Sequence, residues 1–444
     1  MTKSTRALLA PLTSATRRSA ATVVSLALVG GLVLGGCAAT TTDSSTSATS
    51  ETTTSQTTTE TSSSTSTTAI DTTATGTADA TTTAQTISET AEAAQAFLDT
   101  LTDEQREAVL YAYDDETKST SWSNFPVTFV ERAGLNLTDL TEEQQAAALA
   151  VMESLLSEEA YATVAGIIGG DQYLLEESST TEDSLGQYYI AFFGDPSDSS
   201  AFTVQFGGHH LGINATLDGA AGTITFAPTH LGVQPAVYTD ADGEEVQPFD
   251  GIYTDAFAFF DSLTAEQQAT LTSGEVTSCA PGDTCDFASG SGLTGADLTD
   301  EQRELLLALI ANWAGMADEE TTEAALAEIE ATLDDTVVAW SGETTYDMST
   351  GNGINFSISG PDVYISFQAQ GGSAGADVEG VTTSGWGHVH TIYRDPGNDY
   401  AGSVTQEAAT SGPGAGGGMP GGDGTAPSGG PGGQPPTDTE TTTG

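Results

Sequence analysis

The sequence predicts an α+β protein with a largely antiparallel sheet and several capped helices, flanked by disordered tails. Two observations support this prediction. Short stretches rich in β-branched and aromatic residues end at turn signals, as strands do. Around them, a helix-start motif of the form Leu-Thr-x-Glu-Gln recurs four times. Strands grouped between helical segments are typical of this fold class.

The first 36 residues have the pattern of a lipoprotein signal peptide. Basic residues from Lys3 to Arg18 precede an apolar run over 20–34, which is too short for an ordinary membrane-spanning helix. Two glycines then lead into Cys37, so we expect Cys37 to be lipidated and to anchor the protein outside the cytoplasmic membrane, at the cell surface or envelope. A plain secretory signal with an incidental cysteine is the alternative. Replacing Cys37 by alanine should release a lipoprotein from membranes.

Two segments contain too few apolar residues to offset the entropy of ordering, and both are predicted to be disordered. They are a Thr/Ser-rich tether over 37–87 and a Gly/Pro/Thr-rich tail over 406–444. Residues 88–405 between them are predicted to form a single domain. The chain has 9 basic and 63 acidic residues, and its net charge of −54 repels nucleic acid and anionic lipid. We therefore expect a small-molecule ligand, and membrane contact through the lipid anchor alone.

Helices are predicted to begin after the threonines of the recurring motif, Thr102, Thr141, Thr264 and Thr299. In each copy the threonine is the N-cap and the glutamine three residues later completes a capping box. An array of structural repeats is the alternative interpretation. The intervals between copies are irregular, which favours four separate, well-capped helices in one domain.

Strands are predicted over 187–193, 201–206, 212–217, 222–227, 354–358, 363–368 and 389–393. A different feature, the pair Cys279 and Cys285, flanks a Pro-Gly turn. In an exported protein such a pair is expected to form a disulfide, and a redox or metal role is the alternative.

Four of the five histidines lie in two short stretches, each preceded by glycine. His388 and His390 are two residues apart, so both side chains point to one face of a strand. His209 and His210 are adjacent, so only one of them is expected to share that face. We predict that His388, His390 and one of this pair bind one divalent ion, zinc or copper, because three imidazoles with an open position suit either metal. A metal-free polar cleft and a packed, structural role for these histidines are the alternatives.

Other polar residues near these stretches are candidates for supporting roles. Asp395, Asp399 and Asn214 are candidate hydrogen-bond acceptors that fix the imidazole tautomers. Arg394 either holds an anionic group of a substrate beside the metal or forms a structural pair with one of these aspartates. We take Arg394, Asp395 and Asp399 as the candidate catalytic residues, and His230 as structural. Metal occupancy should fall as the pH drops through roughly 6.5, where histidine ordinarily becomes protonated.

Four motifs together resemble a known bacterial family, the domain of unknown function 3500. They are Trp122–Pro126, Phe206–Leu211, Ala339–Gly342 and His388–Tyr400, and the resemblance covers about 88–402. The family pattern has an acidic residue near the position where this chain has Ser366. The resemblance implies no particular activity.

Two classes of function are compatible with these residues. The first is a metal-dependent surface enzyme of hydrolase or lyase type, in which a metal-bound water attacks a small polar substrate. The second is a non-catalytic surface protein that binds a metal ion or a small ligand. An open coordination position favours the enzyme, and a fully ligated ion favours the binding protein.

Overall fold

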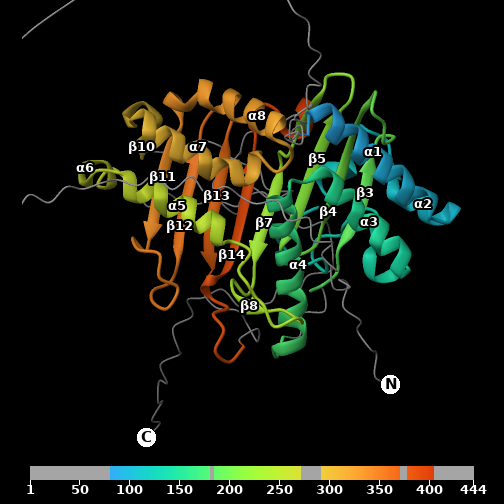
Figure 1. Cartoon of the computed structure of the whole chain (residues 1–444), viewed down its shortest axis with the longest axis horizontal. Coiled ribbons are helices and arrows are strands. Elements are labelled where there is room, and N and C mark those ends of the chain that lie inside the picture. The colour runs from blue at the N-terminus through green and yellow to red at the C-terminus, as the bar shows by residue number, and fades with distance from the viewer. Residues whose placement is uncertain (1–80, 181–184, 272–291, 371–377, 405–444) are drawn as a thin grey trace, which may run out of the picture. The chain divides into compact units, whose positions relative to one another are not determined.

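The structure, a computed structural model, describes residues 81–180, 185–271, 292–370 and 378–404 (Figure 1). These residues belong to one compact unit. The predicted signal peptide, Cys37, the cysteine pair at 279 and 285, and the tail from 406 lie outside them. In the part that is described, no helix is both long enough and apolar enough to cross a membrane.

The fold is α+β, as predicted. The helices in the described part of the chain are α1 (Thr83–Asp99), α2 (Asp103–Val109), α3 (Glu142–Leu155), α4 (Glu158–Glu177), α5 (Asp250–Ser262), α6 (Ala265–Gln268), α7 (Asp300–Ala314) and α8 (Glu319–Ala331). Short 3-10 turns are η1 (Glu116–Ser119), η2 (Leu137–Asp139), η3 (Gly295–Asp297), η4 (Leu333–Asp335) and η5 (Asp399–Gly402).

The four predicted capping boxes are confirmed at the starts of α2, α3, α6 and α7. A fifth capping box is at the start of α1. The Thr82 side chain accepts from the Gln85 backbone N–H, and the Gln85 side chain accepts from the Thr82 backbone N–H. Helix α1 therefore starts at Thr83, and residues 83–87, which we assigned to the tether, are helical. The local cap and the apolar residues that follow it, among them Ile87, outweigh the polar composition of this segment.

A twelve-stranded, mostly antiparallel sheet runs through the structure in the order β1-β3-β4-β5-β7-β14-β13-β12-β11-β10, with β2 beside β3 and β6 beside β5. Its strands are β1 (Leu110–Tyr111), β2 (Leu135–Asn136), β3 (Tyr189–Phe193), β4 (Ala201–Gly207), β5 (Leu211–Asp218), β6 (Thr223–Thr225), β7 (Thr229–Val233), β10 (Leu293–Thr294), β11 (Val337–Gly342), β12 (Ile354–Ser359), β13 (Tyr364–Gln370) and β14 (Gly385–Arg394). A separate hairpin is formed by β8 (Tyr238–Thr239) and β9 (Glu245–Val246).

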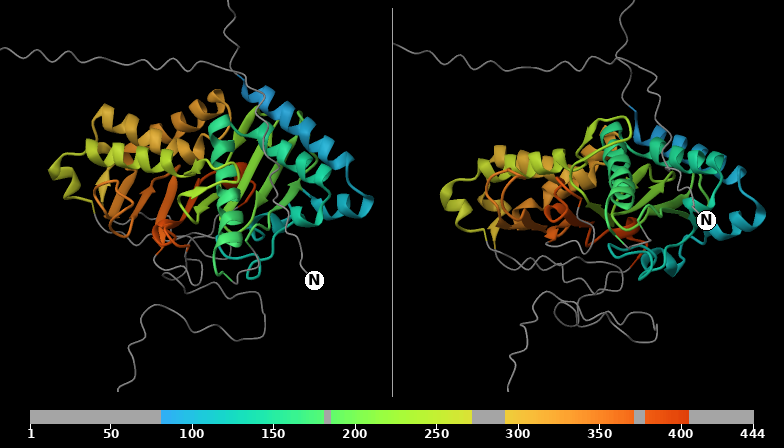
Figure 2. Two further views of the ribbon diagram at one scale, coloured as in Figure 1. Left: turned by 60° about the horizontal axis from the view of Figure 1, so that its bottom comes forward. Right: turned by 90° about the horizontal axis from the view of Figure 1, so that it is seen from below.

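Helices cover one face of the sheet, as Figure 2 shows. Helix α1 packs on α3, and α5 packs on α7. Alternate residues of each strand, such as Leu231 and Val233 of β7, point into the hydrophobic core on this side. The intervening residues, His230 and Gly232, therefore face the opposite side of the sheet.

The two halves of the domain have the same architecture. In the first half, α1, α2, the short strands β1 and β2, α3 and α4 precede the meander β3-β4-β5-β7. In the second half, α5, α6, a short strand, α7 and α8 precede the meander β11-β12-β13-β14. The two meanders run from opposite edges of the sheet to its centre, where β7 and β14 pair antiparallel. Figure 1 shows the first half in blue to green and the second in yellow to red.

The correspondence extends to single hydrogen bonds. The short strand β2 pairs Leu135 with Ile190 of β3, and β10 likewise pairs Leu293 with Val338 of β11. In the first half the Leu137 N–H donates to the Tyr188 carbonyl at 2.8 Å. In the second half the Gly295 N–H makes the equivalent bond to the Thr336 carbonyl, also at 2.8 Å.

The capping glutamines repeat the pattern too. In the first half Gln144 donates to Gln105 at 3.0 Å, and in the second half Gln302 donates to Gln267 at 2.9 Å. The four copies of the helix-start motif are thus two equivalent pairs rather than four unrelated starts.

Candidate metal centre

The five histidines come together where the two halves meet. His209 and His210 form the connection between β4 and β5, His230 lies on β7, and His388 and His390 lie on β14. His390 pairs with Gly232 of β7, and the Gly232 N–H donates to the His210 carbonyl at 2.7 Å. The pairing of β7 with β14 thereby brings the two histidine stretches side by side.

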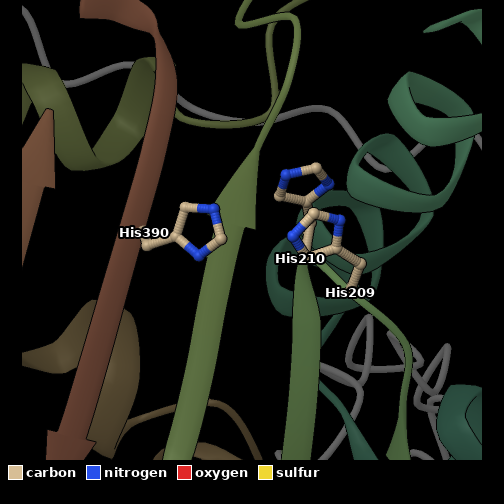
Figure 3. A group of neighbouring side chains, drawn as sticks. All are labelled: His209, His210 and His390. Atoms are coloured by element: carbon tan, nitrogen blue, oxygen red, sulfur yellow. The ribbon is translucent and has the colours of Figure 1, made fainter. Parts of the chain in front are cut away.

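Three imidazoles form the convergent group: His209, His210 and His390 (Figure 3). One nitrogen from each ring lies within 4.8 Å of the others. The His209 and His210 rings stack with their centroids 4.2 Å apart, and the His390 ring lies 5.1 Å from that of His210. All three residues are buried, with exposed fractions of 8%, 0% and 2%.

We expected only one of His209 and His210 to reach the site, because neighbours in an extended strand face opposite ways. They lie instead in the connection between two strands, where the alternation of a strand does not apply. Both rings therefore turn to the same side (Figure 3).

Glycines make this close arrangement feasible. A Cβ at Gly208 would lie 2.6 Å from the Gln187 carbonyl oxygen, and one at Gly232 would lie 3.0 Å from the Val389 oxygen and 3.3 Å from His210 Cδ2. Side chains at these two positions would displace the turn or the His210 ring.

His388 has a different place from the one predicted. Its side chain is on the same face of β14 as His390, as the two-residue spacing requires. Its Nε2 lies 3.1 Å from Nε2 of His390, so one of these rings donates to the other. Within the described residues, His388 lies beside the group formed by His209, His210 and His390 and is not a member of that group.

His230 is fully buried, and both of its nitrogens face backbone carbonyls. Nδ1 lies 2.8 Å from the Thr391 oxygen and Nε2 lies 3.1 Å from the His209 oxygen. Burial lowers its pKa to about 3, so the ring is neutral near pH 7. A neutral imidazole has one N–H, so the ring donates to one of these two carbonyls. His230 therefore supports the backbone on which the other histidines lie.

Burial also keeps His390 neutral. Desolvation lowers its pKa well below the usual value, and positive charge on the neighbouring imidazoles, His210 foremost, would lower it further. A neutral imidazole is the form that binds a metal. As a metal ligand, His390 would therefore lose the ion on acidification at a lower pH than the 6.5 inferred from the sequence.

The partner of His210 is a residue that we did not select from the sequence. Asp171 of α4 lies with one carboxylate oxygen 2.5 Å from His210 Nδ1, and Tyr188 Oη donates to the other oxygen at 2.6 Å. The sequence does contain a signal for Asp171: it is a single acidic residue within the apolar part of a helical pattern, directly after Gly169 and Gly170.

The acceptors proposed from the sequence are elsewhere. Asn214 donates to the Pro228 carbonyl at 3.0 Å and accepts from Gln205 at 2.6 Å. Asp399 accepts from the Arg394 Nε at 2.6 Å and also from the Asp395 backbone N–H at 2.9 Å. The Asn214 contacts are with β4 and with the residue before β7, and those of Asp399 lie at the end of β14 opposite to His388 and His390.

Arg394 is likewise distant from the candidate centre. It lies four residues beyond His390 on one strand, which separates their Cα atoms by roughly 13 Å. It is 8% exposed and paired with Asp399, so the geometry supports the structural alternative and not a role in orienting a substrate.

A second basic residue, which we did not select from the sequence, approaches the histidines. Arg132 is buried, and its guanidinium donates to the Gly208 carbonyl at 2.8 Å and to the Ser123 and Phe125 carbonyls at 2.7 and 2.6 Å. It ties the segment containing Trp122–Pro126 to the residue before His209. Burial lowers the pKa of Arg132 to about 10, which leaves it charged at neutral pH.

The fold and site together define an α+β protein with two equivalent halves and a buried histidine cluster at their junction. The model of the family described as "Protein of unknown function (DUF3500)" matches residues 83–402, and the chain belongs to this family. No curated protein and no solved structure matches the chain.

Proposed function

We propose that this protein binds one divalent transition-metal ion, zinc or copper, through His209, His210 and His390. One observation carries the proposal. Nε2 of His210 and Nδ1 of His390 are buried, and neither has a hydrogen-bond partner in the described part of the molecule. A buried polar atom without a partner is destabilising, and a metal ion is the partner that suits several converging imidazole nitrogens.

The donor set fits such an ion. Imidazole suits both zinc and copper, and the ligand nitrogens of a tetrahedral zinc site lie roughly 3.3 Å apart. The present separations, up to 4.8 Å, would close by small rotations of the side chains. The two alternatives agree less well with the structure. A packed structural cluster leaves the two nitrogens without hydrogen-bond partners in the described residues, and a metal-free polar cleft does not agree with the burial of all three rings.

Two uses of the ion are proposed, in order. Three protein ligands leave a fourth position, which favours a hydrolase or lyase type of surface enzyme with a metal-bound water acting on a small polar substrate. The burial of the ligands favours the second use, a non-catalytic protein that binds a metal ion or small ligand. We do not include Arg394, Asp395 or Asp399 in either, because they lie at the other end of β14.

Export belongs to the same proposal. The basic leader, short apolar run and Cys37 support a lipid-anchored protein at the cell surface, with the polar segment after Cys37 as a tether. The large negative charge supports a small-molecule partner over nucleic acid.

The test is metal analysis of the purified protein after incubation with zinc or copper and removal of the excess. We expect one ion per chain. X-ray absorption at the bound metal then separates the two uses. Three imidazoles and one exchangeable water support catalysis, and a site closed by protein ligands supports binding alone. If no stoichiometric ion is found with either metal, the proposed function is wrong.

A further inference from the structure

Asp171 is an acidic residue in an unusual position. It lies on α4 between buried apolar residues such as Ile168 and Leu174, and it is 1% exposed. Burial of a carboxylate is unfavourable unless specific partners compensate for the lost water. The two side-chain partners described for Asp171 are His210 and Tyr188.

We propose that Asp171 is the positioning residue of the metal centre, and that it makes Nε2 the metal-binding nitrogen of His210. A carboxylate oxygen accepts hydrogen bonds, and an imidazole that binds a metal through one nitrogen keeps its proton on the other. Because Nδ1 lies 2.5 Å from Asp171, that proton belongs on Nδ1. Nε2 then carries a lone pair. It is also the His210 nitrogen that is buried without a hydrogen-bond partner in the described residues. Two independent observations thus select the same atom.

Tyr188 holds the carboxylate in this orientation. Its hydroxyl donates to the second oxygen of Asp171, which leaves the first oxygen directed at His210. The Tyr188 ring is fixed by stacking on Phe206, with centroids 6.0 Å apart, and it lies against Gly208 just before the histidines. The helix, the residue before β3 and the turn are therefore linked through one short chain, Tyr188–Asp171–His210.

This inference rests on the proposed function but goes beyond it, because it assigns the ligand atom and the residue that selects it. A carboxylate that accepts from a metal-bound histidine fixes the ring orientation and increases the basicity of the ligand. Removal of such a residue typically lowers metal affinity by about 10- to 100-fold.

The first experiment measures metal affinity by competition with a chromophoric chelator, using the full chain. The variants are Asp171→Asn and Asp171→Ala, with Tyr188→Phe, which keeps the ring, as a milder change. The control is Glu177→Gln, an exposed carboxylate near the end of the same helix. We expect affinity to fall by about 10- to 100-fold for the Asp171 variants and less for Tyr188→Phe, with the control unchanged. Wild-type affinity in both Asp171 variants would overturn the inference.

The second experiment needs no metal. Nitrogen-15 NMR of the histidine rings in the metal-free protein reports which nitrogen of His210 is protonated. We expect Nδ1–H in wild type and in Glu177→Gln, and a shift towards the Nε2–H tautomer in Asp171→Ala. A wild-type ring protonated at Nε2 would contradict the inference even if metal binds. If wild type binds no metal, the proposed function fails, whereas this measurement still decides the role of Asp171.

Discussion

The two halves of the molecule have the same backbone plan and different chemistry. The β4–β5 connection of the first half and the β12–β13 connection of the second are equivalent: Gly207 pairs with Gly212 in one, and Ser359 pairs with Tyr364 in the other. The Gly208 N–H donates to the Leu211 carbonyl at 2.8 Å, and the Gly360 N–H donates to the Val363 carbonyl at 2.7 Å. His209 and His210 occupy the first connection, and Pro361 and Asp362 occupy the second.

Strand β14 passes both places. Its first part brings His388 and His390 to the histidine connection, and at its other end Arg394 pairs with Tyr364, close to Pro361 and Asp362. At that end the Asp362 side chain accepts a hydrogen bond from the Thr332 hydroxyl at 2.8 Å. Burial raises the pKa of Asp395, which is also close enough to Asp399 and Asp362 for their negative charges to contribute to the rise. One end of the junction is therefore rich in imidazole and the other in carboxylate.

The helices differ in a way that matters for the site. Helix α4 has 20 residues and α8, which follows α7 in the second half, has 13. Asp171 is the fourteenth residue of α4, just beyond the length of α8. The repeated scaffold therefore supplies two equivalent turns, and a few side chains and one longer helix make only one of them a candidate metal centre.

The largest effect is expected from matched substitutions at the two connections. His210→Ala removes a proposed metal ligand and should lower metal affinity by more than the roughly 100-fold typical of a supporting residue. Asp362→Ala, at the equivalent position, should leave affinity unchanged. Both are measured by chelator competition. Equal losses in the two variants would mean that the two ends do not differ in this way.

A smaller effect is expected at the carboxylate end. Burial, with a smaller contribution from the Asp399 and Asp362 charges, raises the pKa of Asp395 from 3.8 to about 7. The folded state therefore holds a proton that the unfolded state releases above about pH 4. Stability should fall as the pH rises from about 4 to about 7, and then level off.

Asp395→Asn tests this pH dependence. The free energy of unfolding of the variant should not fall between about pH 4 and pH 7 as that of wild type does. Above pH 7 it should exceed that of wild type by on the order of 2 kcal/mol, after allowance for partial exposure. Urea unfolding at several pH values measures the free energy of unfolding of both proteins. An identical pH dependence in wild type and variant would show that the carboxylate end does not keep its acid neutral.

The smallest effect tests the equivalence of the halves. Gln144 and Gln302 each complete a capping box and donate to the C-terminal end of a neighbouring helix, at the Thr100 carbonyl after α1 and the Ser262 carbonyl of α5 respectively. Gln144→Ala and Gln302→Ala should each reduce the free energy of unfolding by about 1–2 kcal/mol, and by similar amounts.

Gln85→Ala is the control for these substitutions, because Gln85 completes the capping box of α1. The excess loss over this control measures the bonds that cross between helices. A large difference between the Gln144 and Gln302 variants in chemical denaturation would contradict the energetic equivalence of the two halves.

The local structure could be predicted from the sequence. The capping boxes at Thr102, Thr141, Thr264 and Thr299 depend on residues three positions apart, so a local rule is sufficient to find them. The alternating and aromatic-rich stretches likewise predicted strands such as β4 and β13, and the motifs predicted the family. The clustering of histidines indicated where a site should be sought.

Only the tertiary structure decided how these parts meet. The pairing of β7 with β14 joins residues as far apart as Leu231 and Thr391, and no local pattern specifies such a pairing. The same pairing separates Arg394 from the imidazoles, although the sequence places it only four residues from His390. Asp171 reaches His210 across 39 residues because burial of the apolar face of α4 places the helix there, and that burial depends on the whole sheet.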